Sequence, residues 1–180
     1  MTSSYQSHTD SQLLRSALGS YTGERCLEIG IGYGSNLIDL VHRFSLVAGT
    51  DITKTEAFKW LDKKMLNLIV TETASCFREK TFDLVFMNPP YLASELIEDP
   101  AVDGGREGFE IPRKFLLDAL TVTKDKGTVL ILLSSESSCE AFIKYARDLK
   151  LEVREIASKH VFFEDLIVYE VKKVPKQSLS

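Results

Sequence analysis

The feature that most constrains the fold of this chain is a regular alternation of short apolar runs with amphipathic stretches. Short apolar runs are typical of strands in a parallel sheet that is covered on both faces, and the stretches between them are typical of the covering helices. The chain has 180 residues and shows no internal repeat or low-complexity linker. Residues 1–180 are therefore predicted to form a single α/β domain.

The order of the elements makes this prediction more specific. Strands are predicted at residues 25–29, 46–51, 68–71, 82–87, 128–134, 151–156 and 162–171. Helices are predicted at residues 34–44, 53–65, 112–120 and 138–149, and residues 1–12 and 173–180 are expected to be weakly structured. We therefore expect a Rossmann-like, seven-stranded, mostly parallel sheet with helices on both faces and an antiparallel closing hairpin.

Composition and charge disfavour several classes of function. The net charge of −4 disfavours, without excluding, an enzyme that holds nucleic acid on a basic surface. The longest apolar stretch, residues 129–133, is far shorter than the ~20 residues that span a bilayer. The polar N-terminus lacks the pattern of a signal peptide, so we expect a cytoplasmic protein with no membrane partner.

The cysteines and histidines are scattered along the chain. Cys26, Cys76 and Cys139 include no CxxC pair, and they are expected to be buried free thiols. The three histidines are equally dispersed, so no metal site is predicted.

A glycine-rich loop, Glu-Ile-Gly-Ile-Gly-Tyr-Gly at residues 28–34, follows the first predicted strand. Open α/β sheets bind ligands at the carboxyl ends of their strands, and Gly30 and Gly32 would let the backbone approach such a ligand. The spacing GxGxG differs from the dinucleotide fingerprint GxGxxG. Glu28 would repel a phosphate but could hold a cationic amino group. Alone, such a loop is more often only a structural turn.

Acidic residues end the next two strands. Asp51 follows Gly30 by about 20 residues, where an acid can accept hydrogen bonds from both ribose hydroxyls of a nucleoside. Glu72 ends the third strand and could accept a hydrogen bond from an exocyclic adenine amine. A ligand with an amino acid end, a ribose and an adenine, but no phosphate, is S-adenosylmethionine. This is the predicted cofactor, bound by Glu28, Gly30, Gly32, Asp51 and Glu72.

The motif Asn88-Pro89-Pro90-Tyr91 follows the fourth predicted strand. Two prolines stiffen the loop, so the side-chain oxygen of Asn88 and the carbonyl of Pro89 could accept hydrogen bonds from one NH2 group. Tyr91 could stack on a flat substrate. Two fixed acceptors would stabilise the positive charge that grows on a nitrogen during methyl transfer. The motif therefore predicts methylation of a planar amide or amine nitrogen, with a simple strand-terminating turn as the alternative.

Together these motifs resemble those of the Rossmann-like amino methyltransferases, which comprise adenine-N6 enzymes and HemK-like protein glutamine methyltransferases. Three segments resemble the release-factor branch of the HemK-like enzymes: residues 5–14 (YQSHTDSQLL), residues 71–73 (TET) and residues 103–108 (DGGREG). Within the first segment Ser7 replaces a proline of the family pattern, whereas Asp10 is retained.

The resemblance implies a set of roles. Asp10 and Asn88 would join the cofactor-binding residues. Asn88, Pro89 and Tyr91 would act in catalysis, and Asn88, Pro90, Tyr91 and Arg106 would bind the substrate. The implied substrate is the glutamine of a GGQ motif in a class 1 release factor. A small zinc-binding activator subunit, paired at a sheet edge in a heterodimer, is also implied.

Several readings remain open from the sequence. An adenine-N6 methyltransferase acting on RNA or DNA is the main alternative, and a non-catalytic scaffold is a third. Arg106 and Glu107 are about as compatible with an exposed loop pair as with substrate binding. Trp60 is expected in the partial core, and Phe162, Phe163 and Tyr169 are expected to fill the sheet.

Overall fold

The structure is a computed structural model that describes residues 3–60, 66–90, 92–93, 103–105, 108–135 and 139–174. The helices are α1 (Ser3–Ala17), α2 (Ala57–Trp60), α3 (Glu110–Val122) and α4 (Cys139–Asp148), with 3₁₀ helices η1 (Leu18–Ser20) and η2 (Ile38–His42). The strands are β1 (Gly23–Ile29), β2 (Phe44–Asp51), β3 (Leu66–Val70), β4 (Phe82–Met87), β5 (Leu92–Ala93), β6 (Asp103–Gly105), β7 (Thr123–Ser134), β8 (Leu151–Val161) and β9 (Glu164–Lys173).

Seven of these strands form one sheet in the order β3-β2-β1-β4-β7-β9-β8. β9 runs antiparallel to both of its neighbours, while the other pairings in this sheet are parallel. The predicted Rossmann-like, seven-stranded sheet with an antiparallel closing hairpin is therefore confirmed. β5 and β6 form a separate two-stranded parallel sheet.

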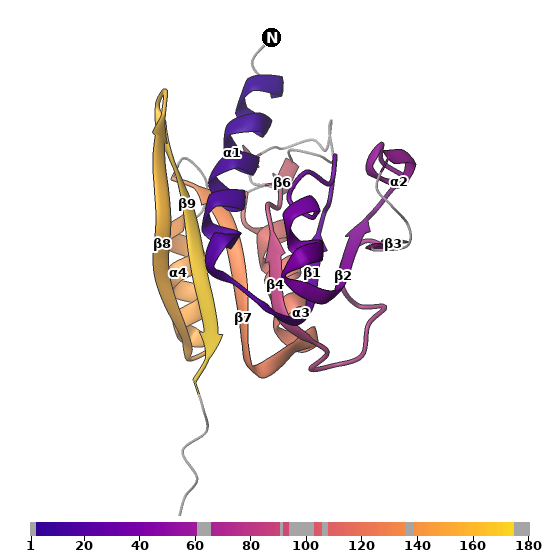
Figure 1. Cartoon of the computed structure of the whole chain (residues 1–180). Helices are drawn as coiled ribbons and strands as arrows, with labels where there is room; N and C mark the ends of the chain where they lie inside the picture. The colour runs from indigo at the N-terminus through magenta and orange to yellow at the C-terminus, as the bar shows by residue number, and fades with distance from the viewer. Residues whose placement is uncertain are drawn as a thin grey trace, which may run out of the picture.

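Helices cover both faces of the large sheet (Figure 1). Side chains alternate along each strand, so that on β1 Cys26 belongs to one core and Leu27 and Ile29 to the other. The first core is shared with α1, η2 and α2, and the second with α3 and α4. This layering explains why the strands are continuous apolar runs in the sequence.

The N-terminal segment corrects the sequence prediction. Residues 3–12 are helical and belong to α1, although they were expected to be weakly structured. The helix is anchored by fully buried Leu14, followed by Leu18 in η1, and Thr9 and Asp10 are also buried. Residues 3–12 show no apolar periodicity that would predict a helix. The helix is instead stabilised by packing against the sheet.

The segment after the glycine loop is the second correction. Residues 34–44 were predicted as an α-helix, but they form successive three-residue turns and the short η2. Leu37 N–H donates to the Gly34 carbonyl, Leu40 N–H to Leu37 and Arg43 N–H to Leu40. Leu37, Leu40 and Phe44 are nevertheless buried as the spacing indicated. The pattern thus predicted the contacts but not the tighter winding.

Other boundaries shift by a few residues. β2 and β3 begin earlier than predicted, β7 begins at Thr123, and β8 continues to Val161. Of the helix predicted at residues 53–65, the structure describes α2, and residues 61–65 lie outside the described part. Residues 175–180 and the side chain of Trp60 also lie outside it.

Two expectations about burial are wrong. Phe162 and Phe163 do not fill the sheet: they form the turn between β8 and β9, with exposed fractions of 70% and 91%. Tyr169 is buried, as predicted. Cys26 and Cys139 are buried free thiols, whereas Cys76 is exposed because it lies in the loop between β3 and β4.

Candidate functional site

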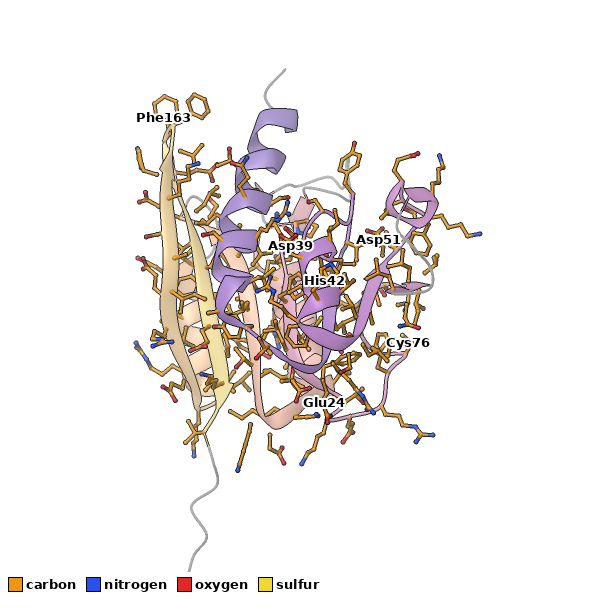
Figure 2. The ribbon with its side chains drawn as sticks, viewed as in Figure 1. Glu24, Asp39, His42, Asp51, Cys76 and Phe163 are labelled. Carbon is orange, nitrogen blue, oxygen red and sulfur yellow. The ribbon has the colours of Figure 1, made fainter. Side chains whose placement is uncertain are left out.

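The residues singled out by the sequence meet at one edge of the sheet. Ile29 at the end of β1 pairs with Thr50 of β2 on one side and with Met87 of β4 on the other. The next residue of each strand is therefore Gly30, Asp51 and Asn88. Parallel strands end at the same edge, and this edge is where ligands bind in sheets of this type. Figure 2 labels Asp51 at this edge, with Glu24 from the start of β1 at the other end.

The glycine loop is held closely against β2. The N–H groups of Gly30 and Ile31 both donate to the Thr50 carbonyl, at 2.9 and 3.0 Å. Gly30 and Gly32 have φ angles of 75° and 49°, a region that side chains disfavour. Below the loop, a Cβ added to Gly49 would lie 2.5 Å from Cγ2 of Ile31. Glycine is therefore favoured at Gly30 and Gly32 by the backbone conformation, and at Gly49 by the side chains packed against it.

Glu28 is a buried carboxylate at the base of this loop, with 2% of its surface exposed. Its Oε1 accepts a hydrogen bond of 2.7 Å from Nδ2 of Asn36. Burial raises the pKa of Glu28 to about 8, an effect that the Asn36 hydrogen bond partly offsets and the Asp51 charge reinforces. Within the described part of the chain, Glu28 Oε2 and Asn36 Oδ1 have no hydrogen-bond donor. The site therefore holds buried acceptors that a ligand with N–H or O–H groups could satisfy.

Asp51 is fixed by backbone amides. Its Oδ2 accepts from Gly32 N–H at 3.0 Å, and its Oδ1 accepts from Thr53 N–H at 3.2 Å. A carboxylate offers about four acceptor positions, so both oxygens keep capacity for the hydroxyls of a ligand. The side chain is half-buried, which leaves it accessible at the sheet edge. The hydrogen bond from Gly32 links the glycine loop to the acidic residue that follows it.

Glu72 lies beside this group, because the neighbouring Thr71 N–H donates to the Asp51 carbonyl at 2.8 Å. Its carboxylate forms an ion pair of 2.5 Å with Lys114 of α3 and is 60% exposed. The sequence did not indicate this pairing. A role of Glu72 toward an adenine amine stays a prediction.

Asn88 ends β4 and is half-buried, but its Oδ1 has no solvent contact and no hydrogen-bond donor in the structure described here. Pro89 is buried and Pro90 is half-buried. Tyr91 and Arg106 lie outside the described residues. Beyond them, the backbone of Leu92–Ala93 pairs with Asp103–Gly105. This pairing brings the glycine-rich segment beside the chain that leaves the Asn-Pro-Pro-Tyr motif.

Two residues at the site escaped the sequence analysis. Asn36 is buried and orients Glu28, yet nothing marked it except its position two residues after the loop. Ile52, directly after Asp51, is an apolar side chain with 60% of its surface exposed at the ligand edge. An apolar residue directly after a strand-ending acid is a signal that sequence reasoning could have used. Asp10 is buried within α1, on the same face of the sheet as the Cys26 core.

In the described ranges, no group of three or more His, Cys, Asp or Glu side chains is placed to hold a metal ion. None of the helices described there combines the length and the apolar character needed to cross a bilayer.

No family model matches the chain. The chain is 30% identical over 175 residues to the proposed protein N5-glutamine methyltransferase MJ0928 of Methanocaldococcus jannaschii, covering 91% of this chain and 89% of that protein.

Many solved structures share the fold, and two of them are methyltransferases of particular interest. One is the Mtq2-Trm112 complex of E. cuniculi, which is responsible for methylation of the translation termination factor eRF1. It matches with a TM-score of 0.78 and 22% identity over 92% of this chain and 96% of that chain. The other is the N-methyltransferase NodS of Bradyrhizobium japonicum WM9 in complex with S-adenosyl-L-homocysteine. Its TM-score is 0.63 with 14% identity, over 93% of this chain and 87% of that chain.

Proposed function

The chain belongs to the protein N5-glutamine methyltransferases, and from this premise we propose that it methylates the side-chain amide of a glutamine in the GGQ motif of a class 1 release factor. S-adenosylmethionine is the methyl donor in this proposal. One observation carries it: buried acceptors lie at the ends of two adjacent strands, on Glu28 and on Asn88, and no donor reaches them from the residues that the structure describes. The acceptor on Glu28 suits the cationic end of the cofactor, and the acceptor on Asn88 suits an amide NH2 group.

The donor set fits the cofactor. An ammonium group carries three N–H donors and a positive charge, which matches the open Oε2 of Glu28 and Oδ1 of Asn36. Asp51 offers its remaining acceptor capacity to ribose hydroxyls, and Ile52 offers an apolar surface to an adenine ring. Gly30 and Gly32 leave no side chain between the loop and the ligand. When bound, the cofactor supplies a methyl group on a sulfonium.

The chain's contribution to the reaction is to hold an amide nitrogen in place. An amide nitrogen is a weak nucleophile because its lone pair is delocalised into the carbonyl. In this proposal Asn88 Oδ1 and the Pro89 carbonyl accept hydrogen bonds from the NH2 group and stabilise the charge that develops on nitrogen. Fixing these acceptors at the end of β4 also limits the approach of the amide to one direction. Tyr91 and Arg106 would complete the substrate site.

The decisive experiment measures transfer of a labelled methyl group to a purified class 1 release factor. Wild-type factor should incorporate one label per chain, and mass spectrometry should place a methyl group on the GGQ glutamine. A factor with alanine at that glutamine should remain unlabelled. Equal labelling of both factors would exclude this substrate.

The same assay addresses the alternative function. Asn88 and Pro89 could also hold the exocyclic amine of adenine, so total RNA and DNA are assayed as parallel substrates. Label in the nucleic acid, with none in the release factor, would favour an adenine-N6 methyltransferase.

We further propose that a small zinc-binding activator subunit pairs with the chain along β3. β3 forms one edge of the sheet, and its sequence LNLIV is unusually apolar for an exposed edge. A shallow depression of about 430 Å³ lies along it, lined by Lys54, Phe58, Leu66, Asn67, Leu68 and Val70. The other edge, β8, carries charged side chains, including Glu152, Arg154 and Lys159, that discourage strand pairing. An added strand is therefore favoured on β3.

A substitution at this edge tests the pairing. Val70 is 46% exposed, so Val70→Lys should leave the free energy of unfolding almost unchanged. It should prevent co-purification with the activator. Glu152→Lys on β8 is the matched control and should co-purify normally. Loss of the partner with the control variant alone would place the interface at the other edge.

A further inference from the structure

The turn between β8 and β9 presents two aromatic side chains to solvent. Phe162 and Phe163 have exposed fractions of 70% and 91%. They connect Val161 to Glu164, which are paired and largely buried. Polar residues and glycine normally occupy a two-residue hairpin turn. Phe163 is almost fully exposed and contributes little to the core, so its presence at this place favours a contact outside the chain.

The backbone of this turn is also unfavourable for its sequence. Phe162 has a φ angle of 53°, in the left-handed region that bulky residues avoid. Glycine or asparagine would adopt it at lower cost. Such conformations persist where the surrounding structure enforces them, and they concentrate at functional sites.

The base of the turn is held firmly. Glu164 is hydrogen bonded to Ser134, and the N–H of Asp165 donates to Ser135 Oγ at 2.8 Å. The N–H of Ser135 in turn donates to the Asp165 carbonyl at 2.9 Å. Asp165 also contacts His160 across the hairpin, at 2.8 Å. These bonds tie the hairpin to the end of β7, so the aromatic tip is presented from a fixed support.

The register of the sheet places the tip relative to the site. Met87 pairs with Ile131, so Asn88 is level with Leu132, which pairs with Val168 of β9. Phe163 precedes Val168 by five residues and lies in the turn just before β9, in the direction of the ligand edge. At about 3.4 Å per residue, the tip projects roughly 17 Å beyond the level of Asn88. Figure 2 shows Phe163 at the opposite end of the molecule from Glu24, where β1 begins.

We propose that the Phe162–Phe163 turn is a docking contact for the folded protein substrate, which it grips at a distance from the methylated glutamine. The tip projects too far beyond the Asn88 level to touch a glutamine side chain held there. A folded protein that offers its glutamine on a loop would cover both places. The inference rests on the proposed function and adds to it a second contact site with an apolar partner surface.

Two substrates separate docking from catalysis: an intact release factor and a short GGQ peptide. Phe163→Ser should lower kcat/KM for the intact factor on the order of 10- to 30-fold, as truncation of an aromatic anchor does. It should change kcat/KM for the peptide by less than about twofold. Phe162→Gly should lower kcat/KM for the intact factor to a similar extent. Its unfolding temperature should equal or exceed that of wild type, since glycine adopts this φ freely. Val174→Ser, at an exposed apolar residue just past the other end of β9, is the matched control.

Binding is measured separately from methyl transfer. Titration with a release factor whose GGQ glutamine is alanine should show weaker binding to Phe163→Ser than to wild type. This keeps the docking site testable even if no glutamine is methylated, an outcome that would count against the proposed function alone.

Three outcomes would overturn the inference. Unchanged kcat/KM and unchanged binding for the intact factor would show that the tip makes no contact. An equal loss with the peptide and the intact factor would assign the tip to the reaction site. If binding to the factor is unchanged, two other results would assign the turn elsewhere. A change in oligomeric state by sedimentation would assign it to a second copy, and loss of binding to anionic phospholipid vesicles would assign it to a membrane surface.

Discussion

The side-chain amide of Asn36 donates a 2.7 Å hydrogen bond to the buried carboxylate of Glu28 and satisfies one of its two oxygens. The other oxygen has no donor among the residues described. Burial raises the pKa of Glu28 to about 8, so near neutral pH the ligand-free carboxyl is mostly protonated. Two measurable consequences follow for the ligand-free protein and for its cofactor complex.

The first consequence concerns stability. The pKa of Glu28 is about 8 in the folded chain and near 4.5 in the unfolded chain, so between these values the folded state binds more protons. The contribution of Glu28 to stability is therefore fully present below about pH 4.5 and is lost as the pH rises through 8. Glu28→Gln should match wild type at pH 5 and exceed its unfolding free energy at pH 8 by roughly 3–5 kcal/mol. Urea unfolding at both pH values measures this, and parallel pH profiles would contradict it.

The second consequence concerns cofactor affinity. A cationic amino group favours the ionised form of Glu28, so binding should release a proton. Between pH 6 and 7.5 the affinity for S-adenosylhomocysteine should rise by up to about 30-fold, because one proton is lost per complex. Glu28→Gln should bind more weakly and show a flatter profile. Calorimetry in buffers of different ionisation enthalpy counts the protons, and a release near zero would refute the pairing.

Asn88 should affect methyl transfer far more than cofactor binding. Asn88→Ala removes one acceptor for the substrate NH2 group and should lower kcat by about 10²- to 10³-fold. The dissociation constant of S-adenosylhomocysteine should change little by comparison. Asn88→Asp keeps an acceptor oxygen at the same position and should retain more activity than Asn88→Ala. Single-turnover kinetics with saturating cofactor separate these effects, and full activity of Asn88→Ala would exclude its role.

Gly49 supports the glycine loop from below. A Cβ at this position would lie 2.5 Å from Ile31 and 3.0 Å from Leu37, so Gly49→Ala must displace the loop. It should cost about 1–3 kcal/mol of unfolding free energy and weaken cofactor binding. Gly19→Ala is the control, since a Cβ there meets nothing within 4 Å. Thermal unfolding and cofactor titration of both variants test the prediction, and equal behaviour would contradict the close approach.

A hydrogen bond between Tyr21, just before β1, and Glu170 of β9 joins two segments that lie far apart in the chain. The Tyr21 hydroxyl donates to Glu170 at 2.7 Å, and burial together with this bond raises the pKa of Tyr21. Burial acts to raise the pKa of Glu170, but the hydrogen bonds from Tyr21 and Lys172 and the charges of Lys172 and Arg154 together lower it.

The stability contributed by the ionised Glu170 is present above its unfolded pKa and is lost as the pH falls through the lower folded value. Tyr21→Phe should therefore destabilise the protein by about 1–2 kcal/mol at pH 7 and by less at acid pH. Denaturant unfolding at several pH values measures the difference. A constant penalty at every pH would show that the charge of Glu170 is not involved.

The sequence determined the strands and the position of most of the candidate site residues, because these depend on local signals. An apolar run bounded by glycine or proline fixes where β1 and β4 end, and the ends carry Gly30 and Asn88 with them. Once the strands were known to be parallel, Asp51 had to lie at the same edge as both. The polar character of Glu28 and Asp51, so close to apolar strands, predicts a ligand at this edge.

Tertiary structure alone decided the features that depend on contacts between distant segments. The burial of Leu14 against the sheet makes a helix of a polar N-terminal segment, and the folding of the loop brings Asn36 onto Glu28. Aromatic residues near a predicted strand were assigned to the core, but the register of β8 and β9 leaves Phe162 and Phe163 at the turn. Periodicity reports which residues prefer to be buried, whereas the pairing of strands determines which residues have anything to be buried against.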